Sequence, residues 1–303
     1  MRLVTRLVVF ILIDKERLKQ EIQEFALSHG ADLIGFAAVA RWPEFNEIPP
    51  DFRPTALWDK TRTVIVLGMQ MPLPIVDTTP SNIHLEAYET SNRELDGLAY
   101  NLTRYLNGKG HASIFLPRDG YRSLKQLLEK PYAAFSHTFA AKYAGLGTVS
   151  RSHNLLTPEF GPRVRLVSVF TAAAVAPDQV LQEDLCINCR LCAKCCPAGA
   201  LIVDEDADSS YYHMETAACV KWHQVLTKRR AYPCGICTKV CPVGKDRELY
   251  GEKGMSKKYL AEQATLEKDI NSPAYKSWTH FRSYGSWAIE NGRIFGPADE
   301  EEK

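Results

Sequence analysis

Apolar positions between residues 14 and 172 repeat with two spacings, one helical and one extended. A face with helical spacing follows Asp14, ends before Gly30 and comprises Leu18, Ile22, Phe25 and Ala26. A second helical face, ended by Gly108, comprises Leu95, Leu98, Ala99, Leu102, Tyr105 and Leu106. Apolar stretches predict strands at residues 32–38, 63–69, 112–116 and 164–171. This alternation predicts an α/β unit with a mixed sheet at residues 14–182.

A short apolar run at residues 7–13 precedes the first predicted helix. It follows Arg2 and Arg6, but it is too short to cross a bilayer, and charged residues follow it without a cleavage site of small residues. No twin-arginine pair precedes this run. We therefore expect a strand or a terminal extension here, in a cytoplasmic protein that does not contact membranes.

The length and composition of the chain allow more than one domain, and its net charge does not favour a charged partner. The chain has 303 residues, 45% of them hydrophobic, which suffices for about two domains. Its 37 basic and 36 acidic residues give a net charge of +1. No overall field therefore favours nucleic acid or membrane binding.

The cysteines form two related runs near the C-terminal end of the chain. The first has the pattern C-x2-C-x2-C-x3-C-P and comprises Cys186, Cys189, Cys192 and Cys196, followed by Pro197. The second comprises Cys234, Cys237 and Cys241, followed by Pro242, with Cys219 displaced upstream. This spacing is typical of bacterial ferredoxins that hold two 4Fe–4S clusters. The sequence predicts two such clusters and a role in electron transfer.

The position of each cysteine before proline predicts how the ligands are shared. In a two-cluster ferredoxin this cysteine crosses to the other cluster. We assign one cluster to the first quartet, Cys186, Cys189, Cys192 and Cys241, and the other to the second quartet, Cys196, Cys219, Cys234 and Cys237. Cys195 is left over, and we expect it to be a small buried side chain. Zinc and disulfides are the alternatives, but zinc does not need two C-x2-C runs each followed by C-P, and disulfide-dense chains are typically short and secreted.

Three units follow from these patterns. Residues 14–182 form the α/β domain, and an alanine-rich stretch at 172–182 marks its boundary. Residues 183–245 form a ferredoxin-like module. Residues 246–303 form a C-terminal extension that packs on both.

Residues 136–162 contain two closely spaced glycines within Ala144, Gly145, Leu146 and Gly147. The structural explanation is a helix that ends at glycine before a tight turn. The functional explanation is a close approach of the backbone to a large cofactor. The dinucleotide fingerprint is incomplete here, because its third glycine and its preceding strand are missing.

The order AGLG, then LLTPEFGPR, then an apolar strand and the C-x2-C-x2-C-x3-C-P run resembles the epoxyqueuosine reductase family. That family shares with the reductive dehalogenases a nitroreductase-like cobalamin-binding domain joined to a two-cluster ferredoxin module. The resemblance implies bound cobalamin, reduced by the nearer cluster, with substrate above the cobalt. It implies cofactor contacts from Ala144, Gly145, Leu146, Gly147, Thr148, Leu155, Thr157, Pro158 and Gly161, and from His223 in the insertion 220–233.

The sequence departs from the epoxyqueuosine reductase pattern in two places. An acidic proton donor is expected about a dozen residues before the AGLG segment, where this chain has Pro131 and Tyr132. We also expect no C-terminal helical repeats of the kind that help those enzymes hold tRNA. Both departures argue against tRNA as the substrate. Tyr132 or His137 would then donate the proton, unless each is a packed helix residue.

Two functions from different classes remain open. One is a corrinoid-dependent reductase of a small or medium organic substrate, fed by an external low-potential donor such as ferredoxin or flavodoxin. The other is a non-catalytic electron-transfer protein that reduces a corrinoid or a partner enzyme. The chain is most similar to a cytoplasmic subgroup, mostly of anaerobes, whose substrates are unassigned.

Overall fold

The computed structural model describes residues 2–45, 47–120, 123–204, 210–228, 230–251, 253–269, 272 and 274. Side chains are described from residue 14 onward, apart from that of residue 266. The predicted C-terminal extension therefore lies largely outside the described residues.

A four-stranded antiparallel sheet forms the centre of the N-terminal part. Its strand order is β1 (Leu33–Ala38), β2 (Thr63–Gln70), β6 (Val164–Thr171) and β3 (Ser113–Leu116). All three pairings are antiparallel, so the predicted mixed sheet is wrong. β2 and β3 do run in the same direction, as a helical crossover between them requires. However, β6 lies between them and pairs antiparallel with both, which a pattern of alternating helices and strands does not reveal.

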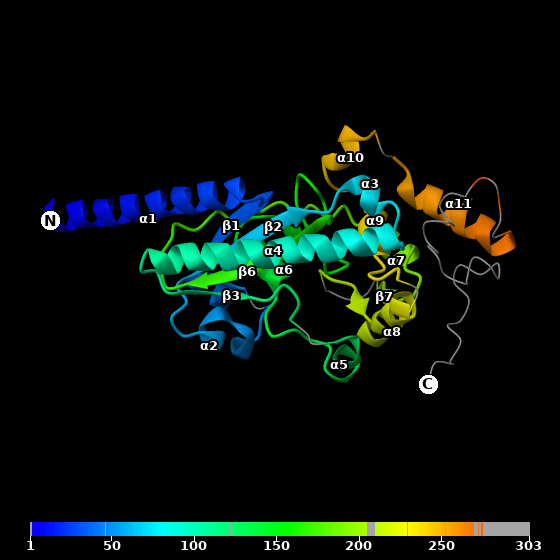
Figure 1. Ribbon diagram of the computed structural model, residues 1–303, viewed down its shortest axis with the longest axis horizontal. Helices are drawn as coiled ribbons and strands as arrows, with labels where there is room; N and C mark the ends of the chain where they lie inside the picture. Colours follow the sequence, from blue (N-terminus) through cyan, green and yellow to red (C-terminus); the bar gives the residue numbers. More distant parts are fainter. Residues whose placement is uncertain are drawn as a thin grey trace.

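Helices cover both faces of this sheet (Figure 1). α1 (Arg2–Ser28) and α4 (Asn82–Gly108) cover one face, with a core that includes Ile22, Phe36, Leu67, Leu102 and Val169. α6 (His137–Tyr143) and the 3-10 helix η1 (Val39–Glu44) cover the other, with a core that includes Trp42, Val66, Ala140, Tyr143 and Phe170. The sheet therefore buries apolar side chains on both faces.

The first helix is longer than its apolar pattern predicts. It begins at Arg2 rather than at Asp14, so the expected strand or extension at residues 7–13 is wrong. Residues 2–28 contain neither glycine nor proline, and each residue added to an existing helix gains a backbone hydrogen bond. The helix continues through the apolar run for this reason. It ends just before Gly30, which has a positive φ of 98°.

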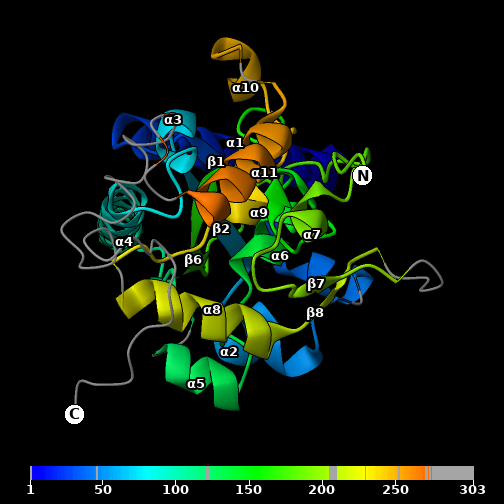
Figure 2. The same ribbon diagram turned by 90° about the vertical axis from the view of Figure 1, so that its right-hand side faces the viewer.

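The cysteine-rich part is built of short elements at one end of the molecule (Figure 2). They are α7 (Leu191–Lys194), β7 (Leu201–Ile202), β8 (His213–Met214), α8 (Thr216–Lys228), α9 (Ile236–Lys239), α10 (Asp246–Leu249) and α11 (Met255–Lys268). α8 packs against α5 (Leu124–Glu129) of the N-terminal part. Cys195 is buried in the small core of this region, as expected.

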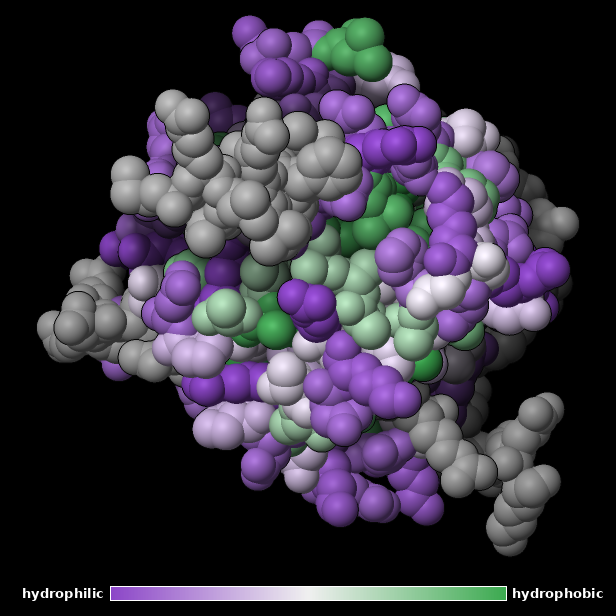
Figure 3. Space-filling model, turned by 90° about the vertical axis from the view of Figure 1, so that its left-hand side faces the viewer, coloured by the Kyte–Doolittle hydropathy of each residue, from purple (hydrophilic) through white to green (hydrophobic). Residues whose placement is uncertain are grey.

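The remaining described elements are short and connect the larger ones. They are η2 (Pro50–Phe52), α2 (Pro54–Leu57), α3 (Leu73–Val76) and the paired strands β4 (Thr148–Val149) and β5 (Leu155–Leu156). The face on the left of Figure 1 is mostly hydrophilic, with hydrophobic residues gathered near its centre (Figure 3). Among the described helices, none combines the length and the apolar character needed to cross a membrane.

Candidate redox and substrate site

The two cysteine runs repeat one local structure. Cys192 and Cys237 are each the second residue of a one-turn helix, α7 and α9. The residue before each helix, Arg190 or Gly235, has a left-handed backbone with a φ near 60°. The internal repeat seen in the spacing is therefore also a structural repeat, and Cys192 and Cys237 occupy equivalent positions.

The predicted quartets line two different cavities. Cys196, Cys219, Cys234 and Cys237 line one of about 380 Å³, which we call the cysteine cavity. Cys186, Cys189, Cys192 and Cys241 line a smaller one of about 30 Å³, which Cys237 also reaches. Within the described part of the chain, no three His, Cys, Asp or Glu side chains are placed to hold a single metal ion. The donor set is thus eight thiols in two groups.

Several of these thiols would be inert without a metal. Burial raises the pKa of Cys234 and of Cys237 to about 12, and that of Cys241 to about 11. Binding to iron deprotonates a thiol, and thiolates are the ligands that iron–sulfur clusters use. The residues present therefore fit iron–sulfur clusters.

A second cavity, which we call the large cavity, adjoins the cysteine cavity and has a volume of about 830 Å³. The two share Tyr88, Asn154, Pro162, Val164 and Arg165 in their walls. The large cavity also reaches Ile48, Phe52, Tyr132, Phe135 and His137. A ligand in the large cavity would contact apolar and aromatic side chains. The second quartet would lie beyond the wall that this cavity shares with the cysteine cavity.

Arg165 forms the polar wall between these cavities. Its Nε donates to Asn92 Oδ1 at 2.9 Å, and its Nη2 lies 3.3 Å from Asp119 Oδ1. Its guanidinium lies 4.4 Å from the centre of the Tyr88 ring. Asp119 also pairs with Arg118, which is bonded to Asp96. No sequence motif marks these residues, although Arg165 is a cation in the largely apolar strand β6 and was the available signal.

Tyr132 and His137, the two predicted proton donors, differ in environment. Tyr132 lines the large cavity, is 57% exposed and makes an edge contact with the Phe52 ring. His137 is buried, and its Nε2 lies 2.9 Å from the Pro117 carbonyl, so Nε2 carries the proton. Nδ1 therefore accepts from the Ser168 hydroxyl at 2.9 Å. Burial lowers the pKa of His137 to about 4, so this ring is neutral near pH 7.

The glycines of the AGLG segment are required by the chain's own backbone. A Cβ on Gly145 would lie 2.2 Å from the Gln179 carbonyl oxygen, and one on Gly147 would lie 1.9 Å from that of Leu156. Gly145 also has a positive φ of 73°. The close approach at these positions is thus between segments of the protein itself.

The other residues implied by the resemblance fall into two groups. Leu155 lines the large cavity, and His223 lines the cysteine cavity. The rest make contacts within the protein: Thr157 and Gly161 bond each other through their backbones, the Pro158 carbonyl accepts from the Lys245 N–H, and Thr148 donates to Asp184. Ala144 and Leu146 pack on the second face of the sheet.

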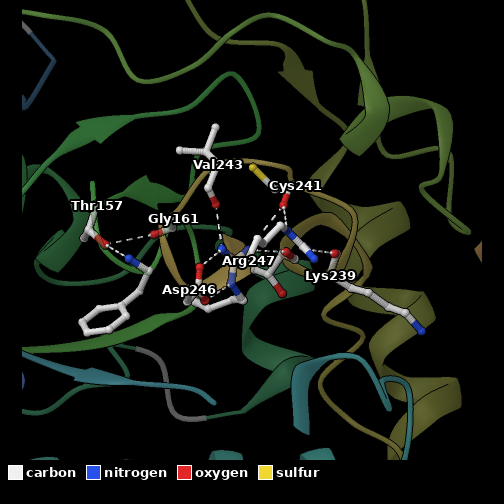
Figure 4. Close-up of polar contacts among 10 residues, drawn as sticks. Thr157, Gly161, Lys239, Cys241, Val243, Asp246 and Arg247 are labelled. Atoms are coloured by element: carbon white, nitrogen blue, oxygen red, sulfur yellow. Dashed lines mark hydrogen bonds and ion pairs between the residues drawn. The ribbon is translucent and has the colours of Figure 1, made fainter. Parts of the chain in front are cut away.

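A buried arginine joins the sheet to the last cysteine. Arg163, just before β6, pairs with Asp246 and donates to the Val243 carbonyl at 2.6 Å. Arg247 donates to the carbonyls of Cys241, at 2.7 Å, and of Lys239 (Figure 4). A Cβ on Gly161 would lie 1.9 Å from the Val243 carbonyl oxygen. Backbone contact and Arg163 therefore hold the segment carrying Cys241 against the N-terminal part, while Arg247 stabilises the fold of that segment itself.

Two groups of reductases match the chain in sequence. A tetrachloroethene reductive dehalogenase of Sulfurospirillum multivorans is 33% identical over 211 residues, which cover 62% of this chain and 41% of that protein. An epoxyqueuosine reductase of Bacillus anthracis is 26% identical over 218 residues, 65% of this chain and 56% of that protein. The chain is related to both families. These relatives are oxidoreductases, and the chain spans only about a quarter to about half the length of the curated proteins it matches. No family model matches the chain.

Solved structures of both families share the fold. A catabolic reductive dehalogenase in complex with 3-bromo-4-hydroxybenzoic acid has a TM-score of 0.60 at 20% identity, covering 84% of this chain and 37% of that one. An epoxyqueuosine reductase with a tRNA-Tyr stem loop has a TM-score of 0.51 at 20% identity, covering 76% of this chain and 66% of that one. The α+β architecture described above is therefore the fold of these reductases.

Proposed function

We propose that this protein is a cobalamin-dependent iron–sulfur reductase. Two 4Fe–4S clusters pass electrons from an external ferredoxin or flavodoxin to a corrinoid, and from there to a small or medium organic substrate. One observation carries this proposal: the four cysteines of the second quartet line a cavity that shares wall residues with the large cavity, which Tyr132 lines. The proposed electron source and the proposed proton source would thus line two neighbouring cavities.

The grouping of the cysteines supports two separate clusters. Each quartet lines its own cavity, and Cys237 of the second quartet also borders the cavity of the first. The first quartet includes the exposed Cys189, which gives an external donor a way in. Electrons would enter at the first cluster and leave from the second.

The large cavity and the cysteine cavity together fit a corrinoid with a substrate beside it. A related solved reductive dehalogenase carries out B12-dependent dehalogenation. Cobalamin, when bound, supplies the strongly reducing cobalt centre that reductive chemistry needs. Leu155, Asn154, Arg165 and His223 line the walls that would hold it. The apolar side chains of the large cavity would exclude water from the substrate.

Tyr132 is the proposed proton donor. Reductive removal of a leaving group consumes two electrons and one proton, and releases the group with the electron pair of the broken bond. The Tyr132 side chain lines the large cavity, whereas both ring nitrogens of His137 are held in hydrogen bonds. We assign the proton to Tyr132 and a structural role to His137.

The proposed substrate is a small organic molecule rather than a modified tRNA. Pro131 and Tyr132 occupy the place where epoxyqueuosine reductases carry their acidic donor. The related reductive dehalogenase in complex with 3-bromo-4-hydroxybenzoic acid accommodates a substituted aromatic acid. Phe52, Phe135 and the cations Arg118 and Arg165 supply a matching mixture of aromatic and positive groups.

Electron paramagnetic resonance of the anaerobically reconstituted protein, with cobalamin added, tests this proposal. A base-off cob(II)alamin signal that disappears on reduction, alongside signals of two reduced 4Fe–4S clusters, is the expected result. Cluster signals with unbound cobalamin would instead favour the non-catalytic electron carrier. The electron-carrier alternative is supported by the absence of an acidic side chain at Pro131 and Tyr132. Multiple turnover of a substrate would exclude it.

A further inference from the structure

The loop at residues 150–154, between β4 and β5, contacts both cysteine quartets. Ser150, Arg151 and Ser152 line the cavity of the first quartet, while Ser152 and Asn154 line the cysteine cavity. Neither the spacing of the cysteines nor the resemblance assigns this loop a role.

Asn154 donates to the second quartet. Its Nδ2 lies 3.6 Å from Cys237 Sγ, a normal distance for a hydrogen bond to sulfur. The same nitrogen donates to Ser152 Oγ at 3.0 Å. Asn154 also lines the large cavity, so its amide lies at the wall between a cysteine ligand and the proposed cofactor space.

Ser152 donates to the first quartet. Ser152 and Cys192 line the same cavity, and the Ser152 hydroxyl lies within hydrogen-bonding reach of the Cys192 thiol. With its proton on this bond, Ser152 Oγ accepts from Asn154 Nδ2 and from Ser150 Oγ, which lies 3.0 Å away. Ser150 Oγ in turn accepts from the Asn154 backbone N–H at 3.2 Å. The directions of all four bonds are mutually consistent.

The two sulfur atoms in this chain of bonds are structurally equivalent. Cys192 and Cys237 hold the same position in α7 and α9. One loop thus supplies one hydrogen-bond donor to the corresponding ligand of each cluster. The loop is itself held in place, because His153 Nε2 donates to the Tyr212 carbonyl at 2.8 Å and the Tyr212 N–H donates to the Arg151 carbonyl at 2.9 Å.

We propose that Ser152 and Asn154 are positioning residues that set the reduction potentials of the two clusters, one each, and link them by a continuous hydrogen-bonded bridge. A donor to a ligand sulfur stabilises the reduced, more negative cluster and so raises its potential. Ser152 acts on the cluster of Cys192 and Asn154 on that of Cys237. This inference rests on the proposed pair of clusters.

Potentiometric titration of the reconstituted protein, followed by electron paramagnetic resonance, tests the bridge. Asn154→Leu removes one donor at similar volume, and with it a hydrogen bond that stabilises the reduced cluster. We expect the reduction equilibrium constant of one cluster to fall by up to about tenfold, which is about 59 mV for one electron. Ser152→Ala should lower the potential of the other cluster by a similar amount.

Three variants serve as controls. Ser150→Ala removes a hydroxyl that is bonded to Ser152 and Asn154 rather than to a cysteine, so it should change each potential less than the loss of a direct donor does. Ser152→Thr keeps the hydroxyl and should restore the potential that Ser152→Ala lowers. Asn154→Asp keeps the size, but its carboxylate cannot donate, so it should lower the potential of the same cluster at least as far as Asn154→Leu.

The outcomes separate this inference from the proposed function. A wild-type protein without two 4Fe–4S signals would contradict the function itself. Two normal clusters whose potentials do not change in any variant would overturn the bridge alone. So would a shift of the same cluster by both Ser152→Ala and Asn154→Leu, or an equal shift caused by Ser150→Ala.

Discussion

Arg163 and Asp246 form a bidentate ion pair in the interior of the protein. Arg163 Nε and Nη2 lie 2.6 Å from the two carboxylate oxygens of Asp246, and the two side chains are 0% and 3% exposed. Arg163 precedes the central strand β6, and Asp246 begins α10 beyond Cys241. The pair therefore joins the sheet to the cysteine-rich part just after Cys241, the last cysteine of the second run.

Replacement of Arg163 by alanine should strongly destabilise the protein. The carboxylate of Asp246 would stay buried without its partner, which costs about 3–5 kcal/mol. Arg163→Lys should recover only part of this loss, because an ammonium cannot bond both oxygens in the geometry of a guanidinium. Urea unfolding of the reconstituted protein measures the difference. The control is Arg17→Ala in the exposed Arg17–Glu21 pair, expected to cost less than about 1 kcal/mol, and an equal effect of both changes would contradict the assignment.

A methyl group at Gly147 should be far more damaging than one at an open glycine. Gly147→Ala would place Cβ 1.9 Å from the Leu156 carbonyl oxygen, so the backbone of β5 must move. Gly97 lies on the exposed side of α4 with nothing within 4 Å, and Gly97→Ala should stabilise the helix by about 0.5–1 kcal/mol. Thermal unfolding of both variants checks the contrast. A tolerated Gly147→Ala would mean that this glycine is present for another reason.

His137 should make folding stability depend on pH. Because burial lowers its pKa to about 4, the unfolded chain binds a proton below about pH 6.5 that the folded protein binds only near pH 4. Acidification from pH 7 to pH 4.5 should therefore cost about 2–3 kcal/mol at this residue. His137→Gln can keep the bonds to Pro117 and Ser168 without titrating, so its free energy of unfolding should fall less over the same range.

The cysteine pairing predicts which variants share a defect. Cys192→Ser and Cys241→Ser should lose the same cluster signal, although these residues are far apart in the sequence. Cys237→Ser should lose the other signal. Cys195→Ala should retain both, because Cys195 lies in the small apolar core and not in either quartet. Electron paramagnetic resonance combined with iron analysis decides this, and loss of different clusters in the first two variants would refute the pairing.

Loss of the Tyr132 hydroxyl should slow turnover without affecting the metal centres. General acid catalysis contributes about 100-fold to 10,000-fold, so Tyr132→Phe should reduce kcat within that range once a substrate is available. Cluster and corrinoid signals should be unchanged. Tyr100→Phe, an exposed tyrosine on α4 outside both cavities, is the matched control. Full activity of Tyr132→Phe would assign the proton to another group.

The strands could be predicted from the sequence much better than their pairing. The predicted stretch 164–171 coincides with β6, and 63–69 matches β2 to within one residue. Strand formation depends on neighbouring residues and on burial, both of which leave a local pattern. The antiparallel order arises because β6 lies between β2 and β3. This placement depends on pairing between β2 and β6, which are about a hundred residues apart in the sequence.

Prediction of the candidate site from the sequence was limited in a similar way. The cysteines could be identified because cluster ligands come in short, regular spacings. Three residues, Arg165, Asn154 and Tyr88, line both cavities. Each stands alone in a strand, loop or helix whose sequence shows no motif for a binding site. His137 shows the opposite case, since a histidine near a predicted donor position is fully bonded within the core.

By itself the sequence determined the ligand set of the candidate redox site, since eight thiols at ferredoxin spacing fit iron–sulfur clusters. It also determined the positions of the central strands. The tertiary structure alone decided that both ring nitrogens of His137 are hydrogen-bonded within the core, and why Gly145 and Gly147 are glycines. The physical reason is that ligand type and helix or strand preference are properties of nearby residues, whereas burial, hydrogen-bond partners and close backbone contacts depend on segments that folding brings together.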